Sequence, residues 1–300
     1  MNMNNKLRQE IVKSIVATYE NSHGFNHIEG PNLPDKQAVL DILQDLISIV
    51  FPSFDKERAL HWDMVEGVIG DLVDKVYKNL VYQVSRAITY SAWTKQENIA
   101  DVKDKAIASV ENLLRSIPDI RNAIKTDVQA AYDGDPAAQS FEEVIIAYPG
   151  LYAITVHRLA HNLFNSDIPI IPRIMNEHAH SKTGIDLHPG ATIGNYFFID
   201  HGTGVVIGET TTIGNYVKIY QGVTLGALSI PKNSQEINGV KRHPTIEDDV
   251  CIYSGATILG GKTKIGTGSV IGGNVWITKS IKPHTKVYIG KPDLIVIRDT

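Results

Sequence analysis

The residue of this chain best suited to acid–base chemistry is His201, in the run Asp200-His-Gly-Thr-Gly204. A histidine side chain titrates near neutral pH, so it can remove the proton from a hydroxyl group as the oxygen attacks. Small neighbours leave its ring accessible, and a nearby carboxylate would hold its tautomer and stabilise the imidazolium. A lone histidine on a strand is more often structural than catalytic, so residue type alone does not decide the role.

Other chemical signatures fail on spacing. Gly261-Lys-Thr263 resembles the end of a phosphate-binding loop, but that loop needs a glycine where the chain has Ala256. Gly202-Thr-Gly204 is not followed by glycine at the spacing of a dinucleotide-binding fingerprint. No metal site is expected, because the candidate histidines are widely spaced: His188, His201, His243 and His284. The single cysteine, Cys251, adjoins an inward residue and is expected to be inert.

The first half of the chain must supply helices. Apolar residues recur there at spacings of three and four, which produces one-sided apolar stripes. One helix is predicted to stop near Pro118, because proline lacks the amide hydrogen that a helix interior needs, and another to bend at Pro149-Gly150. After a first short helix and a loop over 21–34, the predicted helices cover 34–51, 65–80, 107–118, 119–132 and 140–164.

After Gly184 the apolar period changes to six. A helix requires 3.6 and a half-buried strand requires 2, so a period of six fits neither alone. It is typical of a solenoid whose short strands each point one aliphatic residue inward before a corner, where glycine is tolerated. We expect about five coils of roughly eighteen residues, and regard an ordinary all-β domain as the weaker alternative. One series is Leu187, Ile193, Ile199 and Val205; after a lapse at Thr211 it resumes at Val217 and Val223, beside a second series of Ile207, Ile213, Ile219 and Leu225.

Composition narrows the class of protein. The chain has 300 residues, 43% of them hydrophobic and 21% charged, which excludes a disordered chain. A net charge of -4 argues against nucleic-acid binding. With no long apolar run, no signal-peptide core and one cysteine, we expect a cytoplasmic protein that does not contact membranes.

Several segments after Gly184 closely resemble the left-handed β-helix of the serine acetyltransferases. The run 127–164, with Gly134-Asp-Pro-Ala137, also resembles the helical domain that precedes the prism in that family. Hexapeptide repeats alone would indicate only a superfamily of acyltransferases, whereas Asp-His-Gly-Thr-Gly followed by Gly-Glu-Thr is far more specific. The segments are Ile185-Asp-Leu-His-Pro-Gly190, Asp200-His-Gly-Thr-Gly-Val-Val-Ile-Gly-Glu-Thr210, Gln221-Gly-Val-Thr-Leu-Gly226 and Arg242-His-Pro-Thr-Ile246.

The resemblance implies an α+β protein of two domains. An N-terminal all-α helical domain would cover 1–180, with a family extension over 1–115 and the family-like helical part over 119–180. A C-terminal left-handed parallel β-helix of hexapeptide repeats would cover 181–292 and be followed by a short tail, 293–300. The polar run 227–242 cannot sit inside a prism and is expected to protrude as a loop, a common place for function.

The resemblance also assigns roles. His201 would be the general base and Asp186 the carboxylate that orients it. Arg242 and His243 would bind the carboxylate of an amino-acid acceptor, since the guanidinium fork matches that group.

Asp135 and Asp200 would bind the ammonium group of the acceptor. Asp135 followed by proline could instead begin a helix. Glu209 matches the family motif, with an indirect or a solvated role equally open, and His188 is expected to be structural.

The implied co-substrate is acetyl-coenzyme A, with no metal. Its pantetheine arm would lie between neighbouring prisms, held mainly by backbone groups at Gly226, Ala227, Ser254, Gly255, Ala256, Gly272 and Gly273. The chain departs from the usual pattern after Gly226, where Ala227-Leu-Ser begins a longer loop. Lys279, Lys282 and Lys286 could meet the coenzyme's phosphates or be solvated surface.

The expected reaction transfers the acetyl group of acetyl-coenzyme A to the hydroxyl of L-serine, giving O-acetylserine for cysteine biosynthesis. The alternatives are an O-acetyltransferase for homoserine, a sugar or a drug, and a non-catalytic scaffold. The family forms homotrimers with sites between protomers, which the helical half could pair into a dimer of trimers. Cysteine would compete at Arg242 and His243. Docking to O-acetylserine sulfhydrylase is expected to be weak or absent, because the tail ends in Asp-Thr300 rather than isoleucine.

Overall fold

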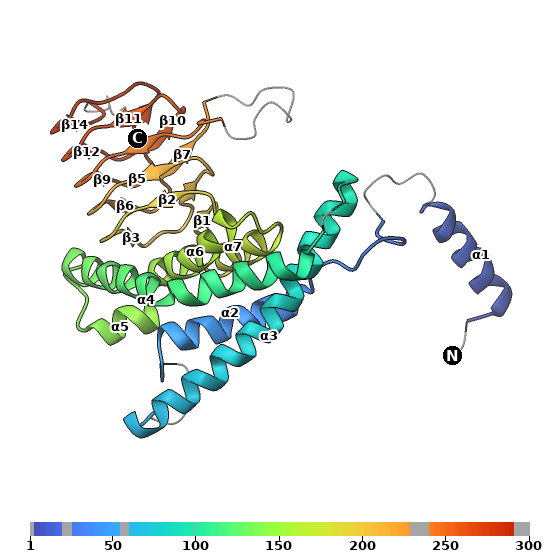
Figure 1. Ribbon diagram of the computed structural model, residues 1–300. Coiled ribbons are helices and arrows are strands. Elements are labelled where there is room, and N and C mark those ends of the chain that lie inside the picture. Colours follow the sequence, from blue (N-terminus) through green and yellow to red (C-terminus); the bar gives the residue numbers. More distant parts are fainter. Residues whose placement is uncertain (1–2, 20–25, 55–59, 99, 229–239, 291–300) are drawn as a thin grey trace.

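The computed structural model describes residues 3–19, 26–54, 60–98, 100–228 and 240–290. A helical region is followed by a parallel β-helix that stands on α6 and α7 (Figure 1). The predicted fold class, an all-α region followed by a left-handed parallel β-helix, is confirmed. Most of the predicted loop 227–242 and the tail 293–300 lie outside the described residues. The helices are α1 Asn5–Ala17, α2 Lys36–Val50, α3 Trp62–Lys95, α4 Val102–Gly134, α5 Phe141–Ala147, α6 Pro149–Asn165 and α7 Ile171–Thr183.

Helix α4 corrects the prediction of two helices separated at Pro118. The helix runs through this proline without ending. Pro118 is exposed, so water can reach the backbone carbonyl that its missing amide leaves unbonded. Burial of the opposite face of α4, including Leu113, Ile117 and Ile124, outweighs the cost of the proline, about 3 kcal/mol.

The bend predicted at Pro149-Gly150 is a break between two helices, because α5 ends at Ala147 and α6 begins at Pro149. Gly150 then lies directly against the first coil of the β-helix. A Cβ atom at this position would lie 2.3 Å from the carbonyl oxygen of Ile199, so only glycine allows this approach. The start of α6 therefore fixes how closely the helices meet the strand that leads to His201.

The β-helix has three parallel faces. Their strand orders are β1-β4-β7-β10-β13, β2-β5-β8-β11 and β3-β6-β9-β12-β14, and we call them faces A, B and C. Strands β1 to β13 occupy faces A, B and C in turn, so each strand from β1 to β10 pairs with the strand three further along; the last strand, β14, pairs with β12 on face C. The strands are β1 Asp186–Leu187, β2 Thr192–Ile193, β3 Phe198–Asp200, β4 Val206–Ile207, β5 Thr212–Ile213, β6 Lys218–Tyr220, β7 Thr224–Gly226, β8 Thr245–Ile246, β9 Cys251–Ile252, β10 Thr257–Leu259, β11 Lys264–Ile265, β12 Val270–Ile271, β13 Trp276–Ile277 and β14 Lys286–Val287.

On most sides of the prism, two residues of each strand segment point inward, whereas the sequence predicted one. The strand residue Ile207 and the corner residue Val205 are both buried, and the same pair of positions recurs around the coils. The change from the first predicted series to the second has a structural cause, whereas the lapse at Thr211 is a buried polar residue at an inward corner position. Asp186 pairs with Val206, 20 positions on, whereas Val206 pairs with Thr224, only 18 positions on. The corner after β3 thus contains two extra residues, which shift the apolar series.

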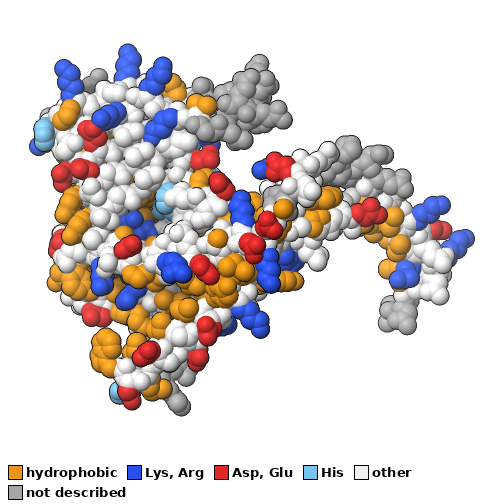
Figure 2. All heavy atoms as spheres, viewed as in Figure 1, with side chains coloured by type: hydrophobic (Ala, Val, Ile, Leu, Met, Phe, Trp, Pro, Cys, Tyr) orange, Lys and Arg blue, Asp and Glu red, His pale blue; other side chains and the backbone are white. Residues whose placement is uncertain are grey.

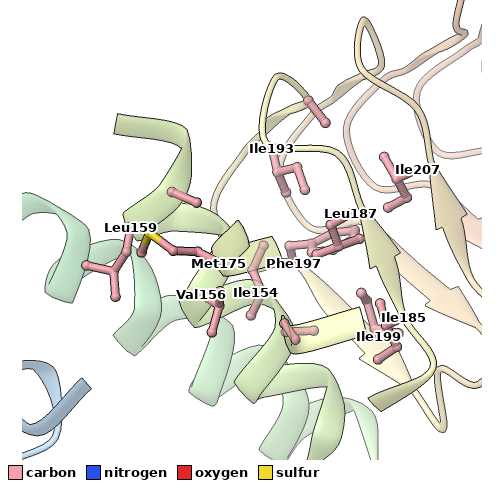
Figure 3. Close-up of a cluster of buried hydrophobic side chains, with 14 of the residues drawn as sticks. Ile154, Val156, Leu159, Met175, Ile185, Leu187, Ile193, Phe197, Ile199 and Ile207 are labelled. Atoms are coloured by element: carbon pink, nitrogen blue, oxygen red, sulfur yellow. The ribbon is translucent and has the colours of Figure 1, made fainter. Parts of the chain in front are cut away.

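One hydrophobic core extends from the helices into the prism. Apolar side chains of α6 and α7 pack against those of the first coils (Figure 3), beside the buried polar side chains of His157 and Asn176, which bond backbone carbonyls of the first coil. The members that Figure 3 labels are Ile154, Val156, Leu159, Met175, Ile185, Leu187, Ile193, Phe197, Ile199 and Ile207. The helices therefore close the open end of the prism.

Helix α1 differs from the other helices because none of its residues is buried. Figure 1 shows it away from the rest of the molecule. Within the described ranges, no helix combines the length and the apolarity needed to cross a membrane.

A buried ion pair joins the helices to the prism. Asp127 of α4 binds Arg158 of α6 through both carboxylate oxygens, at 2.7 and 2.8 Å, with 1% and 9% of the two side chains exposed. Arg158 also donates to the carbonyls of Ile193 and Gly194, and Asp127 accepts from the amide of Phe197. Two helices and the first coil therefore share one hydrogen-bond network.

Replacing Arg158 tests this network. Arg158→Ala leaves the Asp127 carboxylate buried without its partner, so we expect the free energy of unfolding to fall by about 3–5 kcal/mol in urea titrations. The control is Arg115→Ala, whose exposed pair with Glu111 on the same helix contributes about 0.5 kcal/mol or less. A loss for Arg158→Ala no larger than that of the control would contradict the role of the pair.

Candidate active site

The predicted site residues lie at two edges of one prism. Asp200 and His201 follow face C and precede face A, and we call this corner, with Gly222 and Gly255 of the following coils, the histidine edge. Arg242 and His243 precede face B, at the corner that follows face A. We call this corner, with Glu209 and Thr210, the arginine edge. Each strand of face A begins at the first edge and ends at the second, so face A separates the two groups.

His201 lies in the corner with two extra residues and projects from it. Its φ of 60° is in the left-handed region, a conformation that other prism corners also use, and 70% of its side chain is exposed. The Nε2 atom of His201 lies 3.7 Å from Oδ1 of Asp200. An exposed imidazole with a carboxylate beside it can take up a proton from a bound alcohol.

Lys218 holds the Asp200 carboxylate from the next coil. Its Nζ atom lies 3.3 Å from Oδ2 of Asp200 and donates to the carbonyl oxygen of Gly134 at 2.6 Å. Burial opposes the charge of Lys218, but hydrogen bonds with Tyr220 and Asp200 outweigh it and raise its pKa. The lysine stays charged and ties the end of α4 to the histidine edge.

Asp135 lies at the end of α4, so it does not begin a helix as the alternative interpretation held. Its carboxylate accepts hydrogen bonds from the Tyr148 hydroxyl at 2.6 Å and the Ala137 amide at 2.8 Å. These two bonds, and more weakly Lys218 and His201, lower the pKa of Asp135. The first bond also raises the pKa of Tyr148 to about 12, which keeps this hydroxyl a donor. Asp135 therefore presents a fixed negative charge near His201.

Asp186 opens β1, on the outer side of face A. Asp186 and His201 both lie in the described part of the chain, and no hydrogen bond or ion pair joins the Asp186 carboxylate to the His201 ring. That carboxylate lies within 4.8 Å of ligand atoms of Glu177 and His180 of α7. Within one chain the structure therefore brings Asp200, rather than Asp186, beside the imidazole.

Thr210 organises the arginine edge. Its hydroxyl oxygen accepts from the backbone amides of Arg242 and His243 at 2.9 and 3.0 Å. Its own amide donates to Nδ1 of His243 at 3.0 Å. The Arg242 guanidinium forms an ion pair with Glu209, so this glutamate positions the arginine and is not simply solvated.

The electrostatics of His243 follow from its burial. Desolvation, with the nearby charge of Arg242, lowers the pKa of His243 to about 4, so the ring is neutral at neutral pH. Because Nδ1 accepts the Thr210 amide, the ring proton lies on Nε2, which can donate. Gly208 makes room for the ring, since a Cβ there would lie 2.1 Å from it. The edge thus presents a guanidinium and one N–H donor, a suitable pair for a carboxylate.

The predicted coenzyme positions divide between the two edges. Gly226 and Ala227 lie at the arginine edge, where β7 ends. The remaining positions, Ser254, Gly255, Ala256, Gly272 and Gly273, lie along the histidine edge in the coils after His201. Ala256 is fully buried, and its amide and carbonyl bond Tyr253 and Thr224, so it has little to offer a ligand. Figure 2 shows Lys and Arg side chains gathered at the far end of the prism.

Comparisons with known proteins place the chain in a family. The model of the serine acetyltransferase N-terminal region matches residues 72–156, which begins within the segment assigned above to an extension. A plasmid-encoded serine acetyltransferase of Synechococcus elongatus is 46% identical over 254 residues, which cover 83% of this chain and 79% of that protein.

Solved structures agree with the sequence matches. The structure of serine acetyltransferase isoform 3 from Entamoeba histolytica in complex with cysteine is 33% identical, with a TM-score of 0.73, and the match covers 99% of this chain and 96% of that one. The structure of a Neisseria gonorrhoeae serine acetyltransferase in complex with serine is 25% identical, with a TM-score of 0.54 and coverage of 89% and 98%.

The fold is that of the solved serine acetyltransferase structures. The chain belongs to the serine acetyltransferase family. It is accordingly an enzyme of the acyltransferase class.

Sequence reasoning missed Lys218, Tyr148 and Thr210. Lys218 could have been found from the repeat, because it lies opposite Phe198 in the strand that pairs with β3, on the same side of the sheet as Asp200 two residues further on. Tyr148 meets Asp135 only through the turn between α5 and α6, which leaves no signal in the spacing. Burial raises the pKa of the Cys251 thiol, which agrees with the expectation that this residue is inert.

Lys218→Met tests the lysine as a positioning residue. Without the ammonium, Asp200 loses its fixed orientation and the end of α4 loses its bond to the prism, and we expect kcat/KM for serine to fall about tenfold. Lys264→Met is the control, since Lys264 pairs with Glu247 at a different position on the prism. Equal kinetics for both variants would remove Lys218 from the site.

Thr210→Val tests the organisation of the arginine edge. The change keeps the shape but removes the acceptor for two backbone amides, so we expect KM for serine to rise about tenfold. Thr192→Val serves as the control, because Thr192 is an exposed threonine of β2 that lies outside the arginine edge and pairs with Thr212. Steady-state kinetics in which Thr210→Val matches this control would show that the hydroxyl does not hold the pair.

Proposed function

We propose that this protein is a serine O-acetyltransferase that converts L-serine and acetyl-coenzyme A to O-acetylserine and coenzyme A. The observation that carries the proposal is the exposed imidazole of His201 with two oriented carboxylates, Asp200 and Asp135, near it. Together with Arg242 and His243, these groups match the alcohol, ammonium and carboxylate of an amino-acid acceptor. The family to which the chain belongs supports the same reaction.

The transfer proceeds directly within a ternary complex. The hydroxyl oxygen of serine attacks the thioester carbonyl while Nε2 of His201 takes the hydroxyl proton. Collapse of the tetrahedral intermediate breaks the carbon–sulfur bond, and the imidazolium returns the proton to the departing thiolate. Asp200 and Asp135 hold the ammonium, and the backbone near Gly226 stabilises the oxyanion. Asp186 stabilises the imidazolium once substrate has drawn the ring toward it.

The site is completed by a second protomer of a homotrimer. Face A separates the histidine edge from the arginine edge, so one chain cannot place both on one serine. In a threefold arrangement the histidine edge of one prism faces the arginine edge of the next, and the groove between them takes the pantetheine arm. Ser254, Gly255, Gly272 and Gly273, in the coils that follow His201, then line the pantetheine arm.

Cysteine would inhibit by occupying the same place. The Entamoeba histolytica relative is known in complex with cysteine and the Neisseria gonorrhoeae relative in complex with serine. Both amino acids carry the ammonium and carboxylate that Asp135, Asp200, Arg242 and His243 would bind. That sulfhydrylase docking is weak or absent stays a prediction, because the tail 293–300 lies outside the described residues.

His201→Asn tests the base. The amide cannot accept the proton, so we expect kcat to fall about 100- to 10,000-fold, with an unchanged circular dichroism spectrum. Acetyl-coenzyme A consumption is measured with L-serine, homoserine, sugars and water. Near-full activity of the variant would exclude His201 as the base, and equal rates with homoserine or a sugar would overturn the choice of serine.

A further inference from the structure

Three side chains with metal-binding atoms converge where α7 meets β1. Glu177, His180 and Asp186 each place one ligand atom within 4.8 Å of those of the other two. Glu177 and His180 are three residues apart on α7 and share one side of its last turns. Gly184, with a φ of 71°, ends the helix and turns the chain so that Asp186 begins β1 beside them.

The two helical ligands already have a suitable separation. Nδ1 of His180 lies 3.2 Å from Oε2 of Glu177. Two ligands on one tetrahedral zinc ion lie about 3.4 Å apart, given metal–ligand bonds of about 2.1 Å. Arg173 holds the other oxygen of Glu177 at 2.5 Å, which leaves Oε2 directed at the histidine. The side chains of Glu177 and His180 are 45% and 42% exposed, so small rotations can bring them to Asp186.

Asp186 supplies the second observation. Its carboxylate is half-buried and makes no hydrogen bond or ion pair with any described residue. A partly desolvated carboxylate without a partner favours a cation next to it. The carbonyl end of α7, at Thr183, adds further negative potential at this point.

We propose that Glu177, His180 and Asp186 bind one divalent transition-metal ion, of which Zn²⁺ is the preferred species. One imidazole nitrogen and two carboxylate oxygens form a ligand set that zinc accepts, with water in the fourth position. The expectation that the chain has no metal rested on other histidines and did not consider His180. The ion is not a participant in acetyl transfer.

Binding has a consequence that rests on the proposed function. Asp186 is the carboxylate proposed to stabilise the imidazolium of His201. An ion that ligates Asp186 withdraws this carboxylate, so zinc inhibits the enzyme without contacting serine.

Metal binding is tested on the full-length, untagged protein after removal of metals by a chelator. Calorimetric titration with Zn²⁺ should give one site per chain, and Co²⁺ should give a visible absorption band typical of low coordination number. His180→Asn and Glu177→Gln should each weaken zinc binding by about 10–100-fold or more. His178→Asn, on the same helix but outside the cluster, should bind like the wild type. Zinc binding equal in the wild type and both ligand variants would overturn the site.

Inhibition is measured separately, by following loss of the thioester without a thiol reagent. Zinc should inhibit the wild type and His178→Asn, and the inhibition should be lost in His180→Asn, whose metal-free activity is retained. Inhibition that persists unchanged in His180→Asn would mean that zinc acts elsewhere, for example at His201, and would overturn the regulatory part of the proposal. Calorimetric binding without any inhibition would support the site and contradict the role of Asp186 instead.

Discussion

The ion pair between Asp127 and Arg158 determines how the two halves of this protein are joined. A charge pair so little exposed is costly to form unless every remaining polar atom is bonded. Here the surplus donors of Arg158 satisfy carbonyls of the first coil, and Asp127 accepts an amide from the same coil. The helices can therefore dock on the prism in one rotational setting. The apolar side chains of α6, α7 and the first coils then pack into one shared core in this orientation.

The position of the candidate site follows from this docking. Because α4 is fixed through Asp127, its end is fixed too, and Asp135 and the Gly134 carbonyl are delivered to the histidine edge. Lys218 joins that carbonyl to Asp200. Asp135 and Lys218, far apart in the chain, thus meet beside Asp200 and the exposed imidazole of its sequence neighbour His201.

The periodicity of apolar residues was sufficient to predict the fold. The conformational propensity of single residues did not always predict where a helix begins or ends. The six-residue series identified the prism because every coil repeats the same burial requirement. Pro118 was misleading, since its intrinsic cost is smaller than the burial of the helix around it. The separation of Asp135 and Arg242 onto different edges follows from strand order, which only the assembled coils reveal. Tyr148 and Thr210 act through hydrogen bonds that no spacing rule anticipates.

The constant rise per coil of the prism sets the distances between positions along the histidine edge. Strands of face C stack at about 4.8 Å, so the three steps from β3 to β12 place the Gly272-Gly273 corner about 14 Å from the level of His201. Inserting or deleting a whole coil after β7 would lengthen or shorten this distance without moving the imidazole or the helices. With the acyl donor along this edge as proposed, the number of repeats, rather than any single residue, sets the reach that the donor must have.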